Sequence, residues 1–418
     1  MQFSRPRGTR DFLPGEMIKR RYVEGVVRKI FERYGYKEVQ TPVFEELSLI
    51  TRKSGDEIRE RLYDFKDKSG RELALRPELT APAMRLYVNE MQFYSKPIRL
   101  YYFGNCFRYE RPQSGRYREF WQAGVELIGS DAPEADGEII AVAVDVLKSL
   151  ELKNFELRIG NIGIIRKMLR SSGISESEQD RIINAVDRGE SIEELLKKAG
   201  VEGDKIPRFM KLAGERRRVI RDAELLLKGA EILEDIKKFD EMLDLMESYG
   251  IKDYTVDFGI ARGLEYYTGM VFEIYADKLG AQKQICGGGT YSLADVFGGS
   301  KISTRGFAFG FDRLMLALEA EGKLKSEGDG RVLVVPTGEK MVGDAIRVAS
   351  VIRKNRPCEL ELMRKKLGKA LAYADAEGIP FVFIVGEDEL AEGAILLRNM
   401  KTGEQRKMKI DELEKWRQ

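Results

Sequence analysis

The stretch that decides the fold is LYYFGNCFRYERPQSGRYREFWQAGVELIGS, residues 100–130. Its first part, residues 101–109, is aromatic and apolar, and its last part, residues 121–128, alternates apolar and polar residues, as a half-buried strand does. The residues between these parts are mostly charged. The pattern predicts two strands joined by a charged loop.

The two predicted strands each place polar residues on one face. With a side-chain period of two, Gln122 and Glu126 lie on the face opposite the apolar residues of the same strand. Arg108 and Glu110 share a face of the opposing strand, and further arginines follow on the loop. A rigid platform of this kind suits an anionic ligand that also carries a polar group.

Composition limits the class of protein. The length of 418 residues suggests two or three domains, and the net charge of +2 means that any nucleic-acid contact has to come from a local basic patch. The three cysteines match no metal or disulfide spacing. Because the sequence shows neither a signal peptide nor an apolar run of ~18 residues, we expect a soluble cytoplasmic protein without membrane contact.

The chain contains no histidine. This excludes imidazole bases, nucleophiles paired with histidine, and most zinc sites. Any catalysis therefore has to use carboxylates, arginines, tyrosines or a bound ion.

The rest of the chain divides by pattern. Residues 1–168 and 251–325 mix strands with helices, and residues 169–250 between them predict an inserted helical domain. The basic run 216–218 within the insertion is either a solvated helix face or a nucleic-acid contact. After a polar linker, residues 326–418 predict a small α/β domain with a mixed sheet, a hairpin and a last helix.

Polar and charged residues also lie at positions where a predicted strand is followed by a predicted helix. Glu78 and Thr80 follow a strand and precede a helix, so they are either ligand groups or, for Thr80, a helix N-cap. Arg262 interrupts an apolar pattern, and Arg313 begins a helix after a strand with glycines. A run of three glycines after Cys286 matches neither a P-loop nor a Rossmann fingerprint.

Five segments together resemble the signatures of the histidyl-tRNA synthetase family, a class IIa group within the class II aminoacyl-tRNA synthetases. They are PRGTRDFLP, LRPELTAP, FRYERPQSGRYREFWQAGVELIG, ARGLEYYTG and GFAFGFDRL, in the order and at the spacing of that family. The resemblance implies an α+β fold. Its parts would be an antiparallel catalytic sheet with flanking helices (motifs 1 and 2 before the helical insertion, motif 3 after it) and a C-terminal α/β anticodon-binding domain.

The resemblance also implies an activity. Such an enzyme joins L-histidine to ATP as histidyl-adenylate, with Mg²⁺, and passes the histidyl group to the 3′ end of histidine tRNA. It would be a homodimer, with the N-terminal helix and the strand near Pro42 resembling the dimerising motif 1. Because attack at phosphorus brings two anions together, the site needs fixed positive charge.

On the ATP side, the resemblance assigns five residues. Arg108 resembles the motif 2 arginine on the α-phosphate, and Arg313 resembles the motif 3 arginine on the γ-phosphate, with Arg116 beside it. Glu110 would accept a hydrogen bond from the adenine amino group, and Phe120 would stack on the ring. Guanidinium groups suit phosphate because they stay charged and bind in two directions.

On the amino-acid side, the residues that the resemblance assigns are Glu78, Thr80, Gln122, Glu126, Arg262, Tyr266 and Tyr267. The first three would bind the α-ammonium group. Arg262 would bind the carboxylate and the α-phosphate, and would be catalytic together with Arg108 and Arg313. Glu126 and Tyr267 would each bind one imidazole nitrogen, so a substrate without these nitrogens would leave buried polar groups unpaired.

Two further points follow from the resemblance. Gln113 and Arg118 are candidates for contact with the extra 5′ guanosine of histidine tRNA. Thr290 and Ser292 stand where the family commonly has arginine and aspartate. The resemblance therefore does not say which residues support the pocket at this point.

Other functions also remain open. A non-catalytic paralogue that acts as a regulatory subunit of ATP phosphoribosyltransferase is the main alternative, although such paralogues typically lose the tail domain and the special arginine. Another class IIa synthetase is a second alternative.

Overall fold

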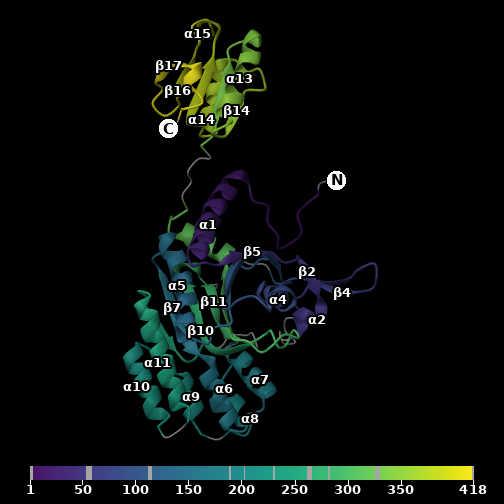
Figure 1. Ribbon diagram of the computed structural model, residues 1–418, viewed down its shortest axis with the longest axis vertical. Coiled ribbons are helices and arrows are strands. Elements are labelled where there is room, and N and C mark those ends of the chain that lie inside the picture. The colour runs from purple at the N-terminus through teal and green to yellow at the C-terminus, as the bar shows by residue number, and fades with distance from the viewer. Residues whose placement is uncertain are drawn as a thin grey trace. The chain divides into compact units, whose positions relative to one another are not determined.

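The computed structural model describes residues 3–52, 59–111, 115–187, 190–201, 203–228, 231–260, 266–280, 283–324 and 330–416. The chain forms two compact units, one from residues 1–12 and 20–324 and the other from residues 13–19 and 325–418 (Figure 1). None of the helices in these described residues is both long and apolar enough to cross a membrane.

The larger unit is built on a nine-stranded sheet in the order β1-β5-β6-β12-β11-β10-β7-β9-β8. Antiparallel pairing joins its middle strands, which are β5 (Ile98–Phe107), β6 (Glu119–Ile128), β12 (Thr304–Gly310), β11 (Gln284–Tyr291), β10 (Tyr267–Ala276) and β7 (Phe155–Asn161). The short strands at the two ends are β1 (Lys37–Glu38), β9 (Thr255–Asp257) and β8 (Ala213–Gly214). The predicted antiparallel sheet with flanking helices is confirmed.

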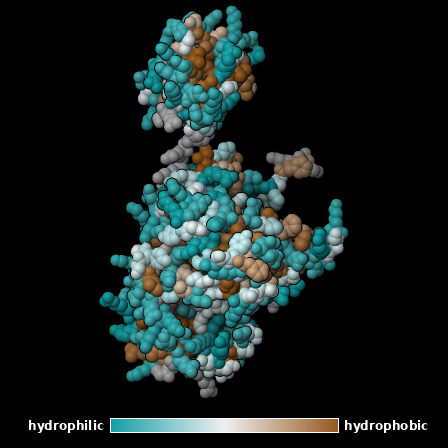
Figure 2. All heavy atoms as spheres, viewed as in Figure 1, coloured by the Kyte–Doolittle hydropathy of each residue, from teal (hydrophilic) through white to brown (hydrophobic). Residues whose placement is uncertain are grey.

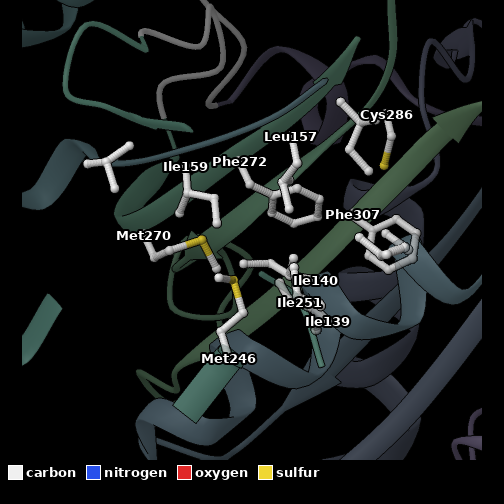
Figure 3. Close-up of a cluster of buried hydrophobic side chains, with 14 of the residues drawn as sticks. Ile139, Ile140, Leu157, Ile159, Met246, Ile251, Met270, Phe272, Cys286 and Phe307 are labelled. Atoms are coloured by element: carbon white, nitrogen blue, oxygen red, sulfur yellow. The ribbon is translucent and has the colours of Figure 1, made fainter. Parts of the chain in front are cut away.

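One face of this sheet packs against α5 (Pro133–Ser149) and α11 (Leu233–Ser248). Figure 3 shows Ile139 and Ile140 of α5 facing Leu157 and Phe272 of the strands, with Met246 of α11 beside them. This apolar layer covers one face of the sheet and leaves the other face for polar groups.

Strand β6 has the two faces that its alternation predicts. Ala123 and Val125 lie in the core, whereas Gln122 lines a cavity on the other face. The predicted strand 101–109 is wrong at its end, because β5 stops at Phe107. The next residues turn away from β6, and the amide of Tyr109 donates to a carbonyl outside the sheet.

The other elements of the larger unit before the insertion lie beside the hairpin of β5 and β6. The helices are α1 (Pro14–Arg33), α2 (Leu47–Thr51), α4 (Thr80–Leu86) and the π-helix η1 (Tyr87–Met91). A small antiparallel sheet contains β2 (Phe44–Glu46), β4 (Glu72–Leu75) and β3 (Asp64–Lys66). After the insertion come η2 (Asp277–Leu279) and α12 (Phe311–Ala320).

The stretch expected to be a helical insertion consists mainly of short helices. They are α6 (Ile162–Ser171), α7 (Glu176–Asp187), α8 (Ile192–Lys198), α9 (Lys205–Met210) and α10 (Arg216–Leu226), followed by α11. Their buried residues, such as Phe209 and Phe239, belong to the same core as the sheet. Arg216 forms ion pairs with three carboxylates of α11, so this arginine of the basic run is engaged within the protein.

The smaller unit has a five-stranded mixed sheet. Its strands, in spatial order, are β14 (Cys358–Leu360), β13 (Val332–Pro336), β15 (Phe381–Val385), β16 (Ala394–Asn399) and β17 (Gln405–Lys409). Its helices are η3 (Glu339–Met341), α13 (Val342–Ile352), α14 (Leu367–Ala376), α15 (Glu387–Ala391) and η4 (Ile410–Glu412). The expected last helix is wrong, since only the 3-10 turn η4 forms. After it the chain returns to the sheet, and Trp416 packs on Phe381 and Phe383.

Candidate active site

A cavity of about 970 Å³ opens on the polar face of the large sheet. The predicted site residues that line it are Glu78, Thr80, Arg108, Glu110, Arg116, Phe120, Gln122, Tyr266, Tyr267 and Arg313. These residues come from the start of α4, the hairpin of β5 and β6, the start of β10 and the start of α12. Segments that are far apart in the sequence therefore meet around one space.

The other four predicted site residues are not among the described residues that line this cavity. Gln113 and Arg262 lie outside the described residues. Glu126 is buried behind Tyr291, and it is Tyr291 that faces the cavity. Arg118 packs its guanidinium on the ring of Tyr109, with 4.0 Å between Cζ and the ring centroid.

One end of the cavity gathers positive charge. The Nε atom of Arg313 donates to the carbonyl of Gly115 at 3.0 Å, and that of Arg108 donates to the carbonyl of Pro77 at 2.8 Å. Burial, followed by the neighbouring Arg108 and Arg116, lowers the pKa of Arg313. Backbone carbonyls thus orient these two guanidinium groups, and cations that repel one another are held together, an arrangement suited to a polyanion.

The residues expected to bind adenine lie beside these arginines. Glu110 forms an ion pair with Arg116, and its second oxygen lies 3.9 Å from Arg61. The guanidinium of Arg108 lies over the ring of Phe120, with 5.2 Å between Cζ and the ring centroid. The residues predicted to bind adenine and phosphate therefore pair with one another in the structure.

The other end of the cavity is a chain of hydrogen bonds with Glu126 at its centre. The hydroxyl of Tyr102 donates to Oε1 of Glu126 at 3.0 Å, and the hydroxyl of Tyr291 donates to Oε2 at 2.5 Å. The hydroxyl of Thr80 lies 3.3 Å from that of Tyr102. Burial raises the pKa of Glu126 to about 8, although the two tyrosine hydroxyls oppose this rise.

Sequence reasoning did not give Tyr102 and Tyr291 a role. Tyr291 lies on β11 and reaches Glu126 on β6 across β12, because the residue of β12 paired with Glu126 is Gly306, which has no side chain. A Cβ at Gly306 would lie 1.8 Å from Oε2 of Glu126. The only signals in the sequence were glycines on the same faces as Glu126, since Gly124 likewise leaves room for the ring of Tyr102.

The turn before α4 is fixed by Glu78. Its carboxylate accepts hydrogen bonds from the amides of Thr80 and Ala81, at 2.6 and 2.9 Å. Glu78 therefore performs the capping that the sequence suggested for Thr80, and the threonine hydroxyl is directed to Tyr102 instead. Burial raises the pKa of Glu78, while the two amides oppose this rise.

The departures at Thr290 and Ser292 leave the cavity intact. The Thr290 hydroxyl donates to Oδ1 of Asp136 on α5 at 2.6 Å, and Arg305, which is paired with Thr290 across the strands, donates to the same oxygen at 2.6 Å. Ser292 donates to Asp295 at the surface. Arg305 thus supplies a guanidinium next to Thr290.

Comparison with known proteins agrees with this geometry. Residues 8–314 match a family model described as histidyl-tRNA synthetase, and residues 331–418 match one described as an anticodon binding domain. A protein of Methanocaldococcus jannaschii named histidine–tRNA ligase is 46% identical over 422 residues, covering 99% of each chain. A protein of Archaeoglobus fulgidus with the same name is 46% identical over 412 residues, covering 97% of each chain.

Solved structures have the same fold. The histidyl-tRNA synthetase of Nostoc sp. PCC 7120 aligns with a TM-score of 0.80 and 25% identity, covering 99% of this chain and 98% of that chain. The apo enzyme of S. aureus aligns with a TM-score of 0.74 and 28% identity, covering 99% of each chain. A Bacillus halodurans protein described as an ATP phosphoribosyltransferase regulatory subunit/histidyl-tRNA synthetase aligns with a TM-score of 0.77 and 25% identity, covering 92% of this chain and 99% of that chain. From the family models and the full-length relatives, this chain belongs to the histidyl-tRNA synthetase family.

Proposed function

We propose that this protein activates L-histidine with ATP and transfers the histidyl group to the 3′ end of histidine tRNA. The observation that carries this proposal is that one cavity joins a cluster of arginines to Tyr291, whose hydroxyl donates to the buried Glu126. The arginines suit the triphosphate and the amino-acid carboxylate. The glutamate suits a side chain that can both donate and accept a hydrogen bond.

The arginines offset the repulsion between the two substrates. Arg108 binds the α-phosphate, Arg313 and Arg116 bind the γ-phosphate, and Arg262 binds the histidine carboxylate. That carboxylate is ionised at neutral pH, so it attacks the α-phosphorus without a general base, and pyrophosphate leaves. Preoriented guanidinium groups stabilise the charge that spreads over the phosphate oxygens in the transition state.

Binding of ATP exchanges partners among residues that pair with one another in the structure. Glu110 releases Arg116 and accepts from the adenine amino group, while Arg116 turns to the terminal phosphate. Phe120 exchanges the guanidinium of Arg108 for the adenine ring. In each case a contact within the protein is replaced by a contact with the nucleotide. The internal contacts resemble those with ATP, so they preorganise these side chains for binding.

Mg²⁺ fits this site as an ion that enters with the nucleotide. No group of three carboxylates or thiols that could hold a metal occurs among the residues described above, and Mg²⁺ commonly uses one or two carboxylates plus substrate phosphates. Glu273 lines the cavity and accepts a hydrogen bond from Gln284, whose carbonyl binds Arg313. Glu273 would hold the ion, which would supply further positive charge to the phosphates.

Histidine recognition takes place at the other end. Glu78, Thr80 and Gln122 bind the α-ammonium group, and the imidazole lies between Glu126 and Tyr267, next to Tyr266. Because Glu126 is buried and already hydrogen-bonded on both oxygens, its position is fixed before the substrate arrives. A side chain without ring nitrogens could make neither the hydrogen bond to Glu126 nor that to Tyr267, which can cost ~10⁴–10⁵ in discrimination.

The tRNA extends beyond the cavity. Gln113 and Arg118 are our candidates for its 5′ end, and the smaller unit binds the anticodon, as its family model indicates. In that unit Leu362 and Met363 are 79% and 74% exposed, and Arg364 to Lys366 follow directly. This loop combines apolar contact with positive charge, as single-stranded nucleic acid requires.

The protein acts as a homodimer in the cytoplasm. Val43, Phe44 and Phe65 belong to or adjoin the small sheet and are 39–51% exposed, and Figure 2 shows hydrophobic side chains on the surface over β2 and β4. A second copy would cover such a patch. Sedimentation of the parent and of Phe44→Asp tests this proposal: the parent sediments as a dimer and the variant dissociates, whereas a monomeric parent would overturn it.

ATP–pyrophosphate exchange with each of the twenty amino acids tests the function. We expect exchange with histidine alone. Exchange with a different amino acid would indicate another class IIa synthetase. The absence of exchange would favour the regulatory-subunit alternative, which then predicts binding to an ATP phosphoribosyltransferase.

A further inference from the structure

The signature PRGTRDFLP near the N-terminus has no role in the site described so far. Its residues Gly8 to Phe12, here called the strap, lie against the loop between β5 and β6. The amide of Arg118 donates to the carbonyl of Gly8 at 2.8 Å. Gly8 has a φ of +86°, and a Cβ there would lie 2.7 Å from Cγ of Arg118, so only glycine fits easily.

The side chain of Arg10 joins two parts of the nucleotide end. Its Cζ atom lies 3.8 Å from the ring centroid of Tyr117, which is on the loop. Its Nη2 atom donates to Oδ1 of Asp312, at the start of α12, at 2.6 Å. A single guanidinium therefore lies over Tyr117 of the loop and donates a hydrogen bond to Asp312 of the helix. Lysine, which has no planar group, cannot make both contacts in this way.

Asp312 is an anchor rather than a mobile partner. It is buried, and it also accepts from Arg20 at 2.7 Å and from the amide of Trp121 at 2.7 Å. Three segments, the N-terminal region, β6 and α12, thus meet at one carboxylate. The strap is fixed to a point that cannot easily move, because separating these groups would leave a buried charge unpaired.

We propose that Arg10 is a positioning residue for ATP, which sets the separation of Arg116 and Arg313. The two contacts of Arg10 are with Tyr117 and Asp312, and each of these is the sequence neighbour of one of those arginines. The inference rests on the ATP-binding part of the proposed function.

The link that Arg10 makes between the loop and α12, here called the brace, has a physical purpose. Arg116 and Arg313 are both cations and repel one another. The contacts of Arg10 therefore add to the hydrogen bond from Arg313 to the Gly115 carbonyl in holding the loop against α12. Asp312 pairs with both Arg10 and Arg20, so it offsets part of the positive charge that Arg10 brings to the link. Since misplacement of a binding group by ~1 Å can cost ~10²-fold, the spacing of these arginines decides how well the triphosphate is held.

Equilibrium binding of ATP and of histidine to the full chain, measured by calorimetry, tests the inference. We expect Arg10→Ala to weaken ATP binding about tenfold and to change histidine binding by less than about twofold. Tyr117→Ala should have the same selective effect while leaving the ion pair of Arg10 with Asp312 in place. Tyr117→Phe keeps the ring and should bind ATP like the parent.

Arg85→Ala is a matched control. Arg85 donates to Glu45 at 2.7 Å, and the two side chains are 26% and 7% exposed, against 26% and 4% for Arg10 and Asp312. It does not belong to the residues that line the cavity. We expect it to lose a comparable ion pair without a selective effect on ATP.

Two outcomes overturn the inference: parental ATP affinity in Arg10→Ala or in Tyr117→Ala, or an equal loss of ATP and histidine binding. If Arg10→Ala does not fold, Tyr117→Ala decides alone. These outcomes separate the two proposals. A parent that binds ATP but does not exchange pyrophosphate with histidine overturns the function only, and exchange with histidine together with parental ATP binding in the variants overturns the brace only.

Discussion

The two ends of the cavity solve opposite electrostatic problems. At the amino-acid end, Glu126 is buried and accepts from two tyrosine hydroxyls. At the nucleotide end, several arginines converge, and Arg313 and Arg108 are held by backbone carbonyls. At the first end, the hydrogen bonds of the glutamate are already made within the protein. At the second end, positive charge is in excess, and the phosphates of the ligand offset it. Selectivity should therefore depend on the first end, and the stabilisation of phosphate charge on the second.

The largest effect should come from breaking the amino-acid end. We expect Glu126→Gln to lower kcat/KM for histidine by about 10³-fold, because one tyrosine hydroxyl then faces an amide nitrogen and the imidazole loses its acidic partner. The KM for ATP should stay within about twofold, since the arginines are untouched. Pyrophosphate exchange at varied histidine and varied ATP measures both. A loss shared equally by the two substrates would contradict the division into two ends.

The converse variant at the nucleotide end should have the next largest effect. Arg313→Ala is expected to lower kcat/KM for ATP by about 10²-fold, because it removes a preoriented cation from the phosphates. Histidine binding in the absence of ATP should remain near that of the parent, as calorimetry can measure. Arg347→Ala, at an exposed ion pair of the smaller unit, is the control. Weakened histidine binding in Arg313→Ala alone would show that the two ends are coupled.

A smaller change probes the space around the glutamate. Gly306→Ala would place a Cβ 1.8 Å from Oε2 of Glu126, so the carboxylate or the strand has to move. We expect about a tenfold rise in the KM for histidine with little change for ATP. Gly343→Ala, on α13 with no atom within 4 Å of the added Cβ, controls for the substitution itself. A parental KM for histidine would mean that the position of Glu126 is not critical.

The smallest effect concerns pH. Glu126 has a pKa of about 8, and the imidazole of free histidine loses its second ring proton above about pH 6.5. Between these values the carboxyl keeps its proton and the imidazole is neutral, so the carboxyl can donate to the unprotonated ring nitrogen. We expect kcat/KM for histidine to be nearly constant in this range and to fall about tenfold per pH unit above it.

Two measurements check the pH prediction. In Glu126→Gln the upper limb of the profile should disappear, and its persistence would assign that limb to another group. The free energy of unfolding gives an independent check. Because the folded state raises this pKa from 4.5 to about 8, it favours the neutral acid, and stability should fall as pH rises through that range. The fall should be smaller in the variant, where Glu78, whose pKa burial also raises, still contributes.

Much of this arrangement could be predicted from local pattern. Alternation along residues 121–128 placed Gln122 and Glu126 on the polar face, because that property depends only on one strand. The roles of Tyr102 and Tyr291 could not be predicted in the same way. They depend on which strands are neighbours and on the register that pairs Gly306 with Glu126, which leaves room for the hydroxyl of Tyr291.

Other differences also have physical reasons. The predicted last helix is only a turn, because Trp416 gains more by packing on the smaller sheet than the segment gains from helical hydrogen bonds. Arg10 belongs to a recognised signature, but its link between Tyr117 and Asp312 spans the length of the larger unit's sequence. No local pattern indicates such a contact.

The chain of hydroxyls around Glu126 has a consequence for spectroscopy. Because the protein has no histidine, the imidazole of a bound substrate would be the only one in a complex of this chain with histidine. Nitrogen-15 resonances of labelled histidine would then report the tautomer and the proton on each ring nitrogen without background from the protein. The hydrogen bond that selects the substrate becomes a signal that can be read directly from the substrate itself.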